Sequence, residues 1–363
     1  MKDTFCLSWD QAHGARLVDF HGWRMPISYA KGILYEHQAT RTQAGLFNIS
    51  HMGRLFITGN EATKFSNFAL TNDIEALPIN NAEYGLLLNQ TGGIIDDVIV
   101  YKYSPHKILW IVNAGNLEKD LQHLQQLAQN YEITIQNISE ETALLALQGP
   151  WSQKVLAPIF EGQDLSQIPY FGFTEGCLLG RHVLVMATGY TGEDGYELMM
   201  DQKDAMPIWE QLAQISGVEP CGLGARDSLR LEAGLPLHGN EMDETTQPFE
   251  VSLNWAVKMN KPGGFYGKES LKLNPNRQLI GVNLVNSVIP RSGQMIFNQD
   301  KVVGHVTSGN FSPTLKKGIA LGSVQKDNLN QSLTIEIRGK HQPIFISKLP
   351  WVRNIKKKKA KRP

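Results

Sequence analysis

The sequence predicts an α+β protein that ends in a separate all-β domain, and three observations support this. Strand-like segments such as "GRLFITG" and "GIIDDVIVYKY" are interrupted by solitary helices, without the strand–helix rhythm of a doubly wound sheet. No repeat occurs at the periods of solenoid proteins. After about Pro275 the chain consists of short strands and polar turns with no convincing helix, which is typical of a sandwich or barrel.

Four helices are predicted in the first two-thirds of the chain, over residues 31–45, 60–70, 116–130 and 204–217. We expect Gly45 to form the C-cap of the first and Asn60 the N-cap of the second. The third has an apolar face at helical spacing. This face consists of Leu117, Leu121, Leu124 and Ala128.

The bulk composition describes an ordinary soluble protein of two or three domains. The 363 residues are 42% hydrophobic and 19% charged, and 35 Lys+Arg balance 35 Asp+Glu. No overall field therefore favours nucleic acid or a membrane. The three cysteines and ten histidines show no disulfide or metal-ligand spacing, so we expect no metal and a reducing compartment. Without a signal peptide or membrane span, the cytoplasm is the expected location.

The stretch "GYTGEDGYELMM" (189–200) is predicted to be a β-hairpin. A phosphate loop would be followed by a helix, and a calcium loop would be flanked by two helices, whereas extended segments lie on both sides here. We expect Gly192 and Gly195 to relieve backbone strain at the turn. Glu197, just past the turn, needs a partner. Solvent, a structural arginine or a ligand with donor groups remain open.

Alternation along "TGGIIDDVIVYKY" (91–103) separates the two adjacent aspartates. Asp97 shares one face with Ile99, Tyr101 and Tyr103, while Asp96 lies on the other face. One aspartate is expected to cap the turn after Gly93, and the other to enter a core or cleft. We assign Asp97 to the cleft because the tyrosines on its face could flank a flat ligand. A structural role for Asp97 remains an alternative.

The segment "PCGLGARDSLRLEAGLPLHGNEMDE" (220–244) is predicted to contain a helix over 225–233 that Gly234 terminates. Arg226 and Arg230 lie one turn apart on it, and Asp227 precedes Arg230 by three residues. A surface salt bridge is one interpretation. An arginine clamp on a ligand carboxylate is the other. No G-x-S-x-G elbow or H-E-x-x-H motif is present, which argues against nucleophilic or metal hydrolysis.

Taken together, the motifs resemble those of the aminomethyltransferase, or T-protein, family of the glycine cleavage system. They occur in order over nearly the whole chain: "VDFHGWRMPISY", "FNISHMGRL", "GGIIDDVIVYKY", "WIVNAGNLEKD", "ALQGP", "GYTGEDGYE", "CGLGARDSLRLEAG" and "GHVTSGNFSPTLKKGIALG". The resemblance implies transfer of the methylene of an aminomethyl-lipoyl group, carried by H-protein, to tetrahydrofolate, with release of ammonia.

The resemblance also implies a cloverleaf of three domains around a folate channel. Residues 1–50 and 140–230 would form a discontinuous α+β domain, and residues 51–139 and 231–273 a second one with the channel. Residues 274–354 would form an all-β barrel or jelly roll, followed by a basic tail at 355–363. The family leads us to expect a monomer that docks H-protein transiently.

Carried over motif by motif, the resemblance makes Asp97 the catalytic residue. It also implies a set of folate-binding positions: Met52, Tyr84, Ile99, Tyr101, Val112, Asn113, Tyr170, Tyr190, Glu197, Arg226, Leu235 and Arg353. The donor-rich edge of a pterin suits the carboxylate of Glu197, and its flat ring suits Tyr190. Arg226 could hold a carboxylate or a polar edge of the folate.

Two departures from the family pattern and two rival functions complete the prediction. Asn48 stands where the family usually has aspartate, and the tail "IKKKKAKRP" is unusually basic; it could help to dock an acidic H-protein. A related folate-dependent demethylase would share the fold. A non-catalytic folate-binding accessory protein is disfavoured because the sequence around Cys221 does not match the cysteine motif of such proteins.

Overall fold

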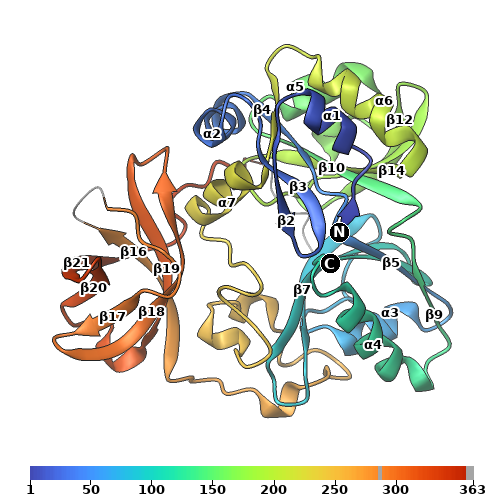
Figure 1. Cartoon of the computed structure of the whole chain (residues 1–363). Helices are drawn as coiled ribbons and strands as arrows, with labels where there is room; N and C mark the ends of the chain where they lie inside the picture. The colour runs from blue at the N-terminus through green and yellow to red at the C-terminus, as the bar shows by residue number, and fades with distance from the viewer. Residues whose placement is uncertain (285–287, 357–363) are drawn as a thin grey trace.

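The computed structural model describes residues 1–284 and 288–356, which form three lobes around a common centre (Figure 1). The arrangement matches the predicted α+β cloverleaf with an all-β C-terminal part. Three open sheets and one closed barrel make up its β structure.

The first lobe is built on a mixed seven-stranded sheet. In spatial order its strands are β11 (Phe160–Gly162), β12 (Phe173–Leu178), β13 (Arg181–Met186), β14 (Gly195–Asp201), β10 (Thr142–Gln148), β4 (Ala44–Asn48) and β15 (Val218–Cys221). We predicted antiparallel sheets, but β15 pairs with β4 in parallel. A small sheet beside it contains β1 (Lys2–Asp3), β3 (Trp23–Ser28) and β2 (Arg16–Phe20), and its β1–β3 pair is also parallel.

Five helices accompany this sheet: α1 (Leu7–Ala12), α2 (Ile33–Thr42), α5 (Ser152–Leu156), α6 (Gln202–Ala213) and α7 (Leu223–Glu232). Buried Ile208, Trp209 and Leu212 of α6 fill a core with strand residues such as Leu145 and Leu198. This core contains a large part of the apolar area that stabilises the lobe.

The second lobe is an antiparallel five-stranded sheet with two helices. Its strands are β6 (Asn81–Leu88), β7 (Ile94–Ser104), β8 (Lys107–Val112), β5 (Gly53–Thr58) and β9 (Thr134–Asn137), and its helices are α3 (Ala62–Ala69) and α4 (Leu117–Leu127). The predicted apolar face of α4 is confirmed, because Leu124 is fully buried in a core with Val98 and Val100 of β7.

The other face of β7 packs against the first lobe. Tyr101, with Ile99 and Tyr103 beside it, belongs to a core shared with Leu144 of β10 and Phe173 of β12. The predicted division of β7 into two faces is therefore confirmed. It places Asp97 on the side of the second sheet that faces the first lobe.

The third lobe is a closed six-stranded barrel, which decides between the predicted barrel and jelly roll. Its strands are β16 (Arg277–Leu284), β19 (Lys317–Gln325), β18 (Lys301–Ser312), β17 (Met295–Asn298), β20 (Leu333–Ile337) and β21 (Lys340–Ser347). Helix α7 lies between this barrel and the first lobe (Figure 1).

Three helices differ from the prediction at one or both ends. Helix α2 ends at Thr42, and Gly45 lies inside β4, where a Cβ would come within 2.2 Å of Thr40 Oγ1. Gly45 is thus required by close packing rather than as a cap. The side chain of Asn60 does not cap α3, which begins at Ala62; it bonds to Glu132 instead. Helix α6 covers 202–213 rather than 204–217.

Candidate functional site

Asp97 lies half-buried on β7 between two donors. The Tyr84 hydroxyl donates to its Oδ2 at 3.1 Å, and Asn113 Nδ2 donates to its Oδ1 at 2.8 Å. Burial and, next, the neighbouring Asp96 raise the pKa of Asp97 to about 7, against the opposite effect of these two hydrogen bonds. A carboxylate with a pKa near neutrality can accept or hold a proton at working pH.

Asp96 is fully buried behind Asp97 and does not cap the turn, contrary to one of our expectations. Its Oδ2 accepts from the Asn113 backbone N–H at 2.9 Å, and its Oδ1 from Asn113 Nδ2 at 2.8 Å and Asn116 Nδ2 at 2.5 Å. The turn is stabilised by Asn89, whose Oδ1 accepts from the Gly93 N–H at 2.9 Å. Asp96 lies too far along the strand to reach it. The Asn113 amide thus connects the two aspartates.

The predicted hairpin at 189–200 is confirmed, because β13 and β14 pair antiparallel with Met186 opposite Glu197. Gly192 has a φ of 78° and relieves strain as expected. Gly195 does not, since its φ is not positive. A Cβ there would lie 2.5 Å from the buried amide of Gln148, so close packing explains this glycine.

Glu197 is buried, and its partners are hydroxyl groups. Thr188 Oγ1 and the Tyr101 hydroxyl donate to its Oε2 at 2.5 and 3.4 Å. Burial raises the pKa of Glu197, and the charge of Arg226 opposes this. Among the described residues no side chain donates to Oε1, so one carboxylate oxygen is available to a ligand donor.

Arg226 presents its guanidinium over an aromatic ring. The group lies 4.9 Å from the ring centroid of Tyr190, whose hydroxyl donates to the Pro236 carbonyl at 2.5 Å. Burial lowers the pKa of Arg226, while Glu197 and Tyr190 oppose the change. Within residues 1–284 and 288–356 the guanidinium forms no hydrogen bond, so its donors are free to hold an acceptor-rich group.

Arg230, by contrast, is a structural residue. Its side chain is 2% exposed and pairs with Glu241 at 3.0 Å and Asp227 at 2.9 Å, and it donates to Ser308 of the barrel at 2.8 Å. The expected salt bridge between Asp227 and Arg230 is therefore confirmed, but the Arg230 side chain is buried rather than at the surface. It ties α7 to the third lobe.

The remaining predicted positions lie in varied surroundings. Met52 and Ile99 pack at the edge of the core between the first two lobes. Burial raises the pKa of Tyr170 to about 12, which the charge of exposed Arg353 opposes. The backbone of Leu235 bonds to Arg230 at its N–H and its carbonyl. The side chain of Val112 is buried in the helix-facing core of the second lobe, away from Asp97.

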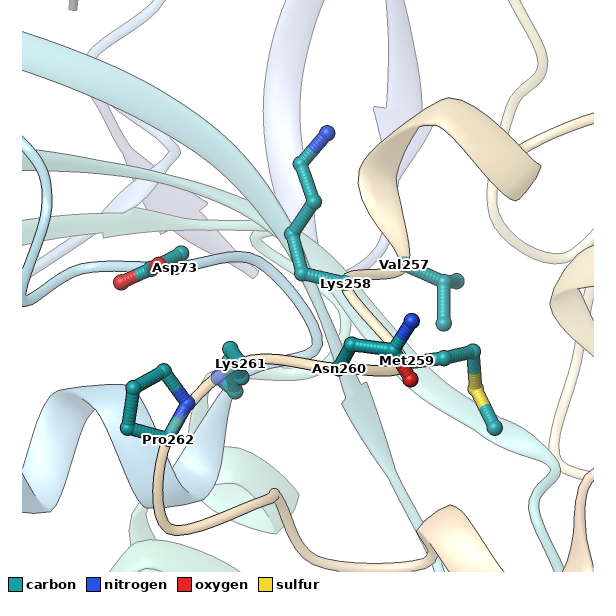
Figure 2. A pocket seen from close by; sticks show the side chains of 7 residues that line it. All are labelled: Asp73, Val257, Lys258, Met259, Asn260, Lys261 and Pro262. Atoms are coloured by element: carbon teal, nitrogen blue, oxygen red, sulfur yellow. The ribbon is translucent and has the colours of Figure 1, made fainter.

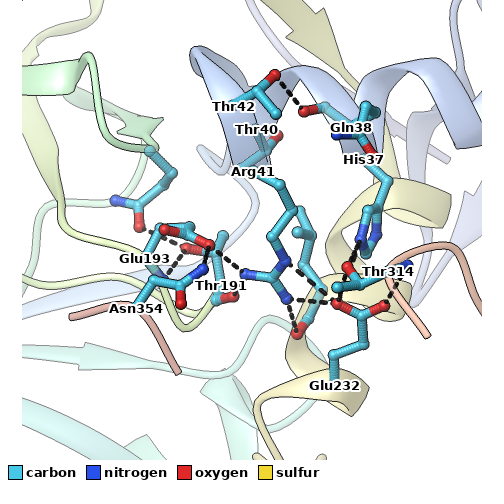
Figure 3. A network of polar contacts seen from close by, with 12 residues as sticks. His37, Gln38, Thr40, Arg41, Thr42, Thr191, Glu193, Glu232, Thr314 and Asn354 are labelled. Carbon is cyan, nitrogen blue, oxygen red and sulfur yellow. Dashed lines mark hydrogen bonds and ion pairs between the residues drawn. The ribbon is translucent and has the colours of Figure 1, made fainter. Parts of the chain in front are cut away.

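A buried network that the sequence did not suggest fixes the hairpin at 189–200 (Figure 3). Arg41 of α2 donates to the Thr191 carbonyl at 2.7 Å and to Glu193 at 2.8 Å, directly after Tyr190. It also pairs with Glu232 of α7 at 2.8 Å. Glu232 in turn accepts from Thr314 of the barrel at 2.8 Å. The network therefore joins the hairpin to two lobes.

The structure contains a cavity of 460 Å³, and Figure 2 shows the side chains that line it. The segment 257–262 and Asp73 line it, and it includes none of the predicted residues. The nearby Trp255, about half exposed, stacks on Tyr84 at 5.2 Å between ring centroids. Asn48, a predicted departure from the family pattern, accepts from the Ser50 N–H at 3.1 Å through its Oδ1.

Comparison with known proteins identifies the class to which this fold and site belong. The profile "GCVT N-terminal domain" matches residues 6–261, and "Glycine cleavage T-protein C-terminal barrel domain" matches residues 277–352. An aminomethyltransferase of Thermotoga neapolitana is 44% identical over 99% of this chain and 100% of its own length. One of Thermosipho melanesiensis is 42% identical over 96% of both chains.

A solved structure agrees with the sequence relatives. The glycine cleavage system aminomethyltransferase T of Bartonella henselae superposes with a TM-score of 0.92 at 36% identity, over 98% of this chain and 99% of that one. The chain belongs to the glycine cleavage T-protein family. It has the function of an aminomethyltransferase, a one-carbon group transferase. Among the described residues, no helix is both long and apolar enough to span a membrane.

Proposed function

We propose that the one-carbon acceptor is tetrahydrofolate and that the donor is an aminomethyl-lipoyl group carried by H-protein. The methylene carbon passes to the folate, giving 5,10-methylenetetrahydrofolate, ammonia and the dihydrolipoyl group. The family membership supports this choice of substrates. The residues present also fit a folate: a flat ring needs aromatic walls, and its polar edges need both acceptors and donors.

Two free groups supply those edges. Oε1 of Glu197 receives no donor within the described residues and suits the amino-pyrimidine edge of a pterin, while the unbonded guanidinium of Arg226 suits an acceptor or a carboxylate. Tyr190 lies against Arg226 and offers a ring for stacking. These three side chains orient the acceptor.

The observation that carries the proposal is the environment of Asp97. Its carboxyl group, with a pKa of about 7, is held by Tyr84 and Asn113 on the sheet face toward the first lobe. As a carboxylate it accepts a hydrogen bond from the reacting N–H and stabilises positive charge that develops there. It can also take the proton when the new bond forms.

Ammonia release from aminomethyl-loaded H-protein tests the proposal, with and without tetrahydrofolate. We expect release that depends on folate and that falls by about 100-fold or more in Asp97→Asn, because a general acid–base group typically contributes that much. Asp10→Asn is the matched control, since Asp10 is also shielded from solvent and accepts a hydrogen bond from a tyrosine hydroxyl, Tyr29, but lies in the first lobe. Unchanged release in Asp97→Asn would move the chemistry to another group.

The same assay separates the rival functions. Folate binding without ammonia release from H-protein would favour a folate-dependent demethylase, and methyl transfer from a small amine or sulfonium donor would then be measured. Folate binding with neither activity would favour an accessory protein. A full-length match to aminomethyltransferases supports the first function over both.

We further propose that the protein works as a cytoplasmic monomer with transient docking of H-protein. The free cysteines Cys6, Cys177 and Cys221 support a reducing compartment. The basic tail is proposed to aid docking, although residues 357–363 lie outside the described part. Exchanging its lysines for glutamine is expected to raise the KM for H-protein at low salt but not at high salt.

A further inference from the structure

Asp120 is a buried carboxyl group that the proposed chemistry does not use. It lies in the first turns of α4, and its side chain is inaccessible to solvent. Neither carboxyl oxygen accepts a hydrogen bond from the described residues. Its own backbone N–H bonds to the carbonyl of Asn116, whose side chain contacts Asp96. Asp120 therefore lies directly behind the Asp96–Asn113–Asp97 arrangement.

The charges around Asp120 do not favour an anion there. Asp96 and Asp97 on β7 are acidic, and Lys119, the cation beside it on α4, pairs with Glu244 at 2.5 Å. His123 on α4 has its pKa lowered by burial, and His238 contacts Asn116 rather than Asp120. Burying an unpaired carboxylate costs several kcal/mol. The field of the helix N-terminus offsets only a small part of this cost.

A proton on Asp120 removes this cost. Burial first, and the charge of Asp96 second, raise the pKa of Asp120 to about 11. Asp96 accepts three N–H hydrogen bonds, the pattern of a carboxylate, and receives them from Asn113 and Asn116. The side chain of Asp120 lies within hydrogen-bonding reach of Asp96, so a neutral Asp120 can donate its O–H to an Asp96 oxygen.

We propose that Asp120 is a positioning residue that remains a neutral carboxylic acid at working pH and supports the Asp96 carboxylate, through which Asn113 holds Asp97. The inference rests on the proposed role of Asp97. It adds a residue that touches no substrate. Its effect passes through two hydrogen-bonded side chains, so it acts on the orientation and acidity of Asp97.

Infrared spectroscopy of the full-length, substrate-free enzyme tests the proton directly. At pH 9, above the pKa of about 7 for Asp97 and below that of about 11 for Asp120, the spectrum of wild type minus Asp120→Asn should contain one protonated-carboxyl band. The matched control is Asp10→Asn, which should lose no such band, because the pKa of Asp10 is raised only to about 6. Absence of the band in the Asp120 difference would overturn the proposal. The readout uses no folate, so it stands even if the proposed function fails.

The pH dependence of kcat tests the positioning role. Asn is neutral and keeps a donor, so Asp120→Asn should hold kcat within about threefold and leave the acid limb of the profile unmoved. Asp120→Ala removes the donor, so kcat should fall while the KM for folate changes little. The acid limb of the pH profile of kcat should also move to higher pH. A downward shift of about one pH unit in Asp120→Asn, as expected when an ionised carboxylate is removed, would refute the inference. If the alanine variant does not fold, the asparagine variant still decides.

Discussion

Replacing Glu232 with glutamine removes the negative charge at the centre of the network that fixes the hairpin at 189–200. The Glu232 carboxylate is fully buried and accepts hydrogen bonds from Arg41, Ser312 and the backbone and side chain of Thr314. Glutamine keeps the shape of the side chain. Its amide NH₂, however, would face donors in place of a carboxylate oxygen. Arg41 would lose one of its two buried counter-ions and keep the other, Glu193.

The structure sets the size of the effect. Burial acts to raise the pKa of Glu232, but hydrogen bonding and charge from His37, Ser312 and Arg41 outweigh it and lower the pKa from 4.5 to about 2. This difference between the unfolded and folded pKa of Glu232 corresponds to roughly 3 kcal/mol of folding stability. Breaking a buried ion pair by removing one partner costs about 3–5 kcal/mol in general, and we expect the lower end of that range because Arg41 keeps Glu193 as a buried partner.

The sign of the pH dependence follows from the lowered pKa. The contribution of Glu232 is fully present above its unfolded pKa of 4.5 and is lost as the pH falls toward 2. Urea unfolding at pH 7 should therefore show Glu232→Gln to be less stable than wild type by about 3 kcal/mol, and the gap should narrow only below pH 4.5.

A surface pair provides the control for this experiment. Glu219 pairs with Lys31 at 2.9 Å, but the lysine side chain is 56% exposed, so Glu219→Gln should cost under about 1 kcal/mol. A gap below about 1 kcal/mol for Glu232→Gln at pH 7, or one that widens as the pH falls, would refute the reasoning.

Two further predictions concern the site itself. Tyr84→Phe removes a donor to the Asp97 carboxylate, and hydrogen bonds to charged groups contribute about 1.5–3 kcal/mol, so the acid limb of kcat/KM against pH should move up by about one unit. Tyr103→Phe, on the same face of β7, should leave the limb in place; equal shifts would contradict the assignment. Gly192→Ala puts a side chain at a φ of 78° with its Cβ 2.8 Å from that of Ala233, so it should lower the melting temperature and raise the KM for folate. A melting temperature and a KM equal to those of wild type would contradict this prediction and show that the loop adjusts to the side chain without cost.

Much of the fold could be predicted from sequence patterns, because the residues that face a core recur at the period of the strand or helix that carries them. The two faces of β7 and the apolar face of α4 lie as expected, since every second or every third-to-fourth residue must meet a core. Gly45 shows the limit. A glycine after a helix predicts a cap, but Gly45 lies inside a strand, where close packing against Thr40 leaves no space for a side chain.

The site was predictable only in part, for a physical reason. Asp97 could be placed because strand alternation sets its side. The role of Asn113 as a bridge between Asp96 and Asp97 depends on where β8 ends, which no local pattern gives. Asp120 has the sequence signature of an acidic residue in the first turns of a helix, which usually faces water. Only its burial distinguishes it.

The network around Glu232 also has a consequence for biosynthesis. The partners of Arg41 lie far along the chain, in the hairpin near residue 191 and in α7. The two glutamates that it contacts bind residues that are later still, because Glu232 accepts from Thr314 of the barrel and Glu193 accepts from Asn354. The Gly192 carbonyl accepts from the backbone N–H of Asn354, so the ribosome must release nearly the whole chain before the hairpin is locked. A nascent chain that contains Tyr190 but ends before Thr314 therefore lacks Thr314 and Asn354, which complete the network around this hairpin.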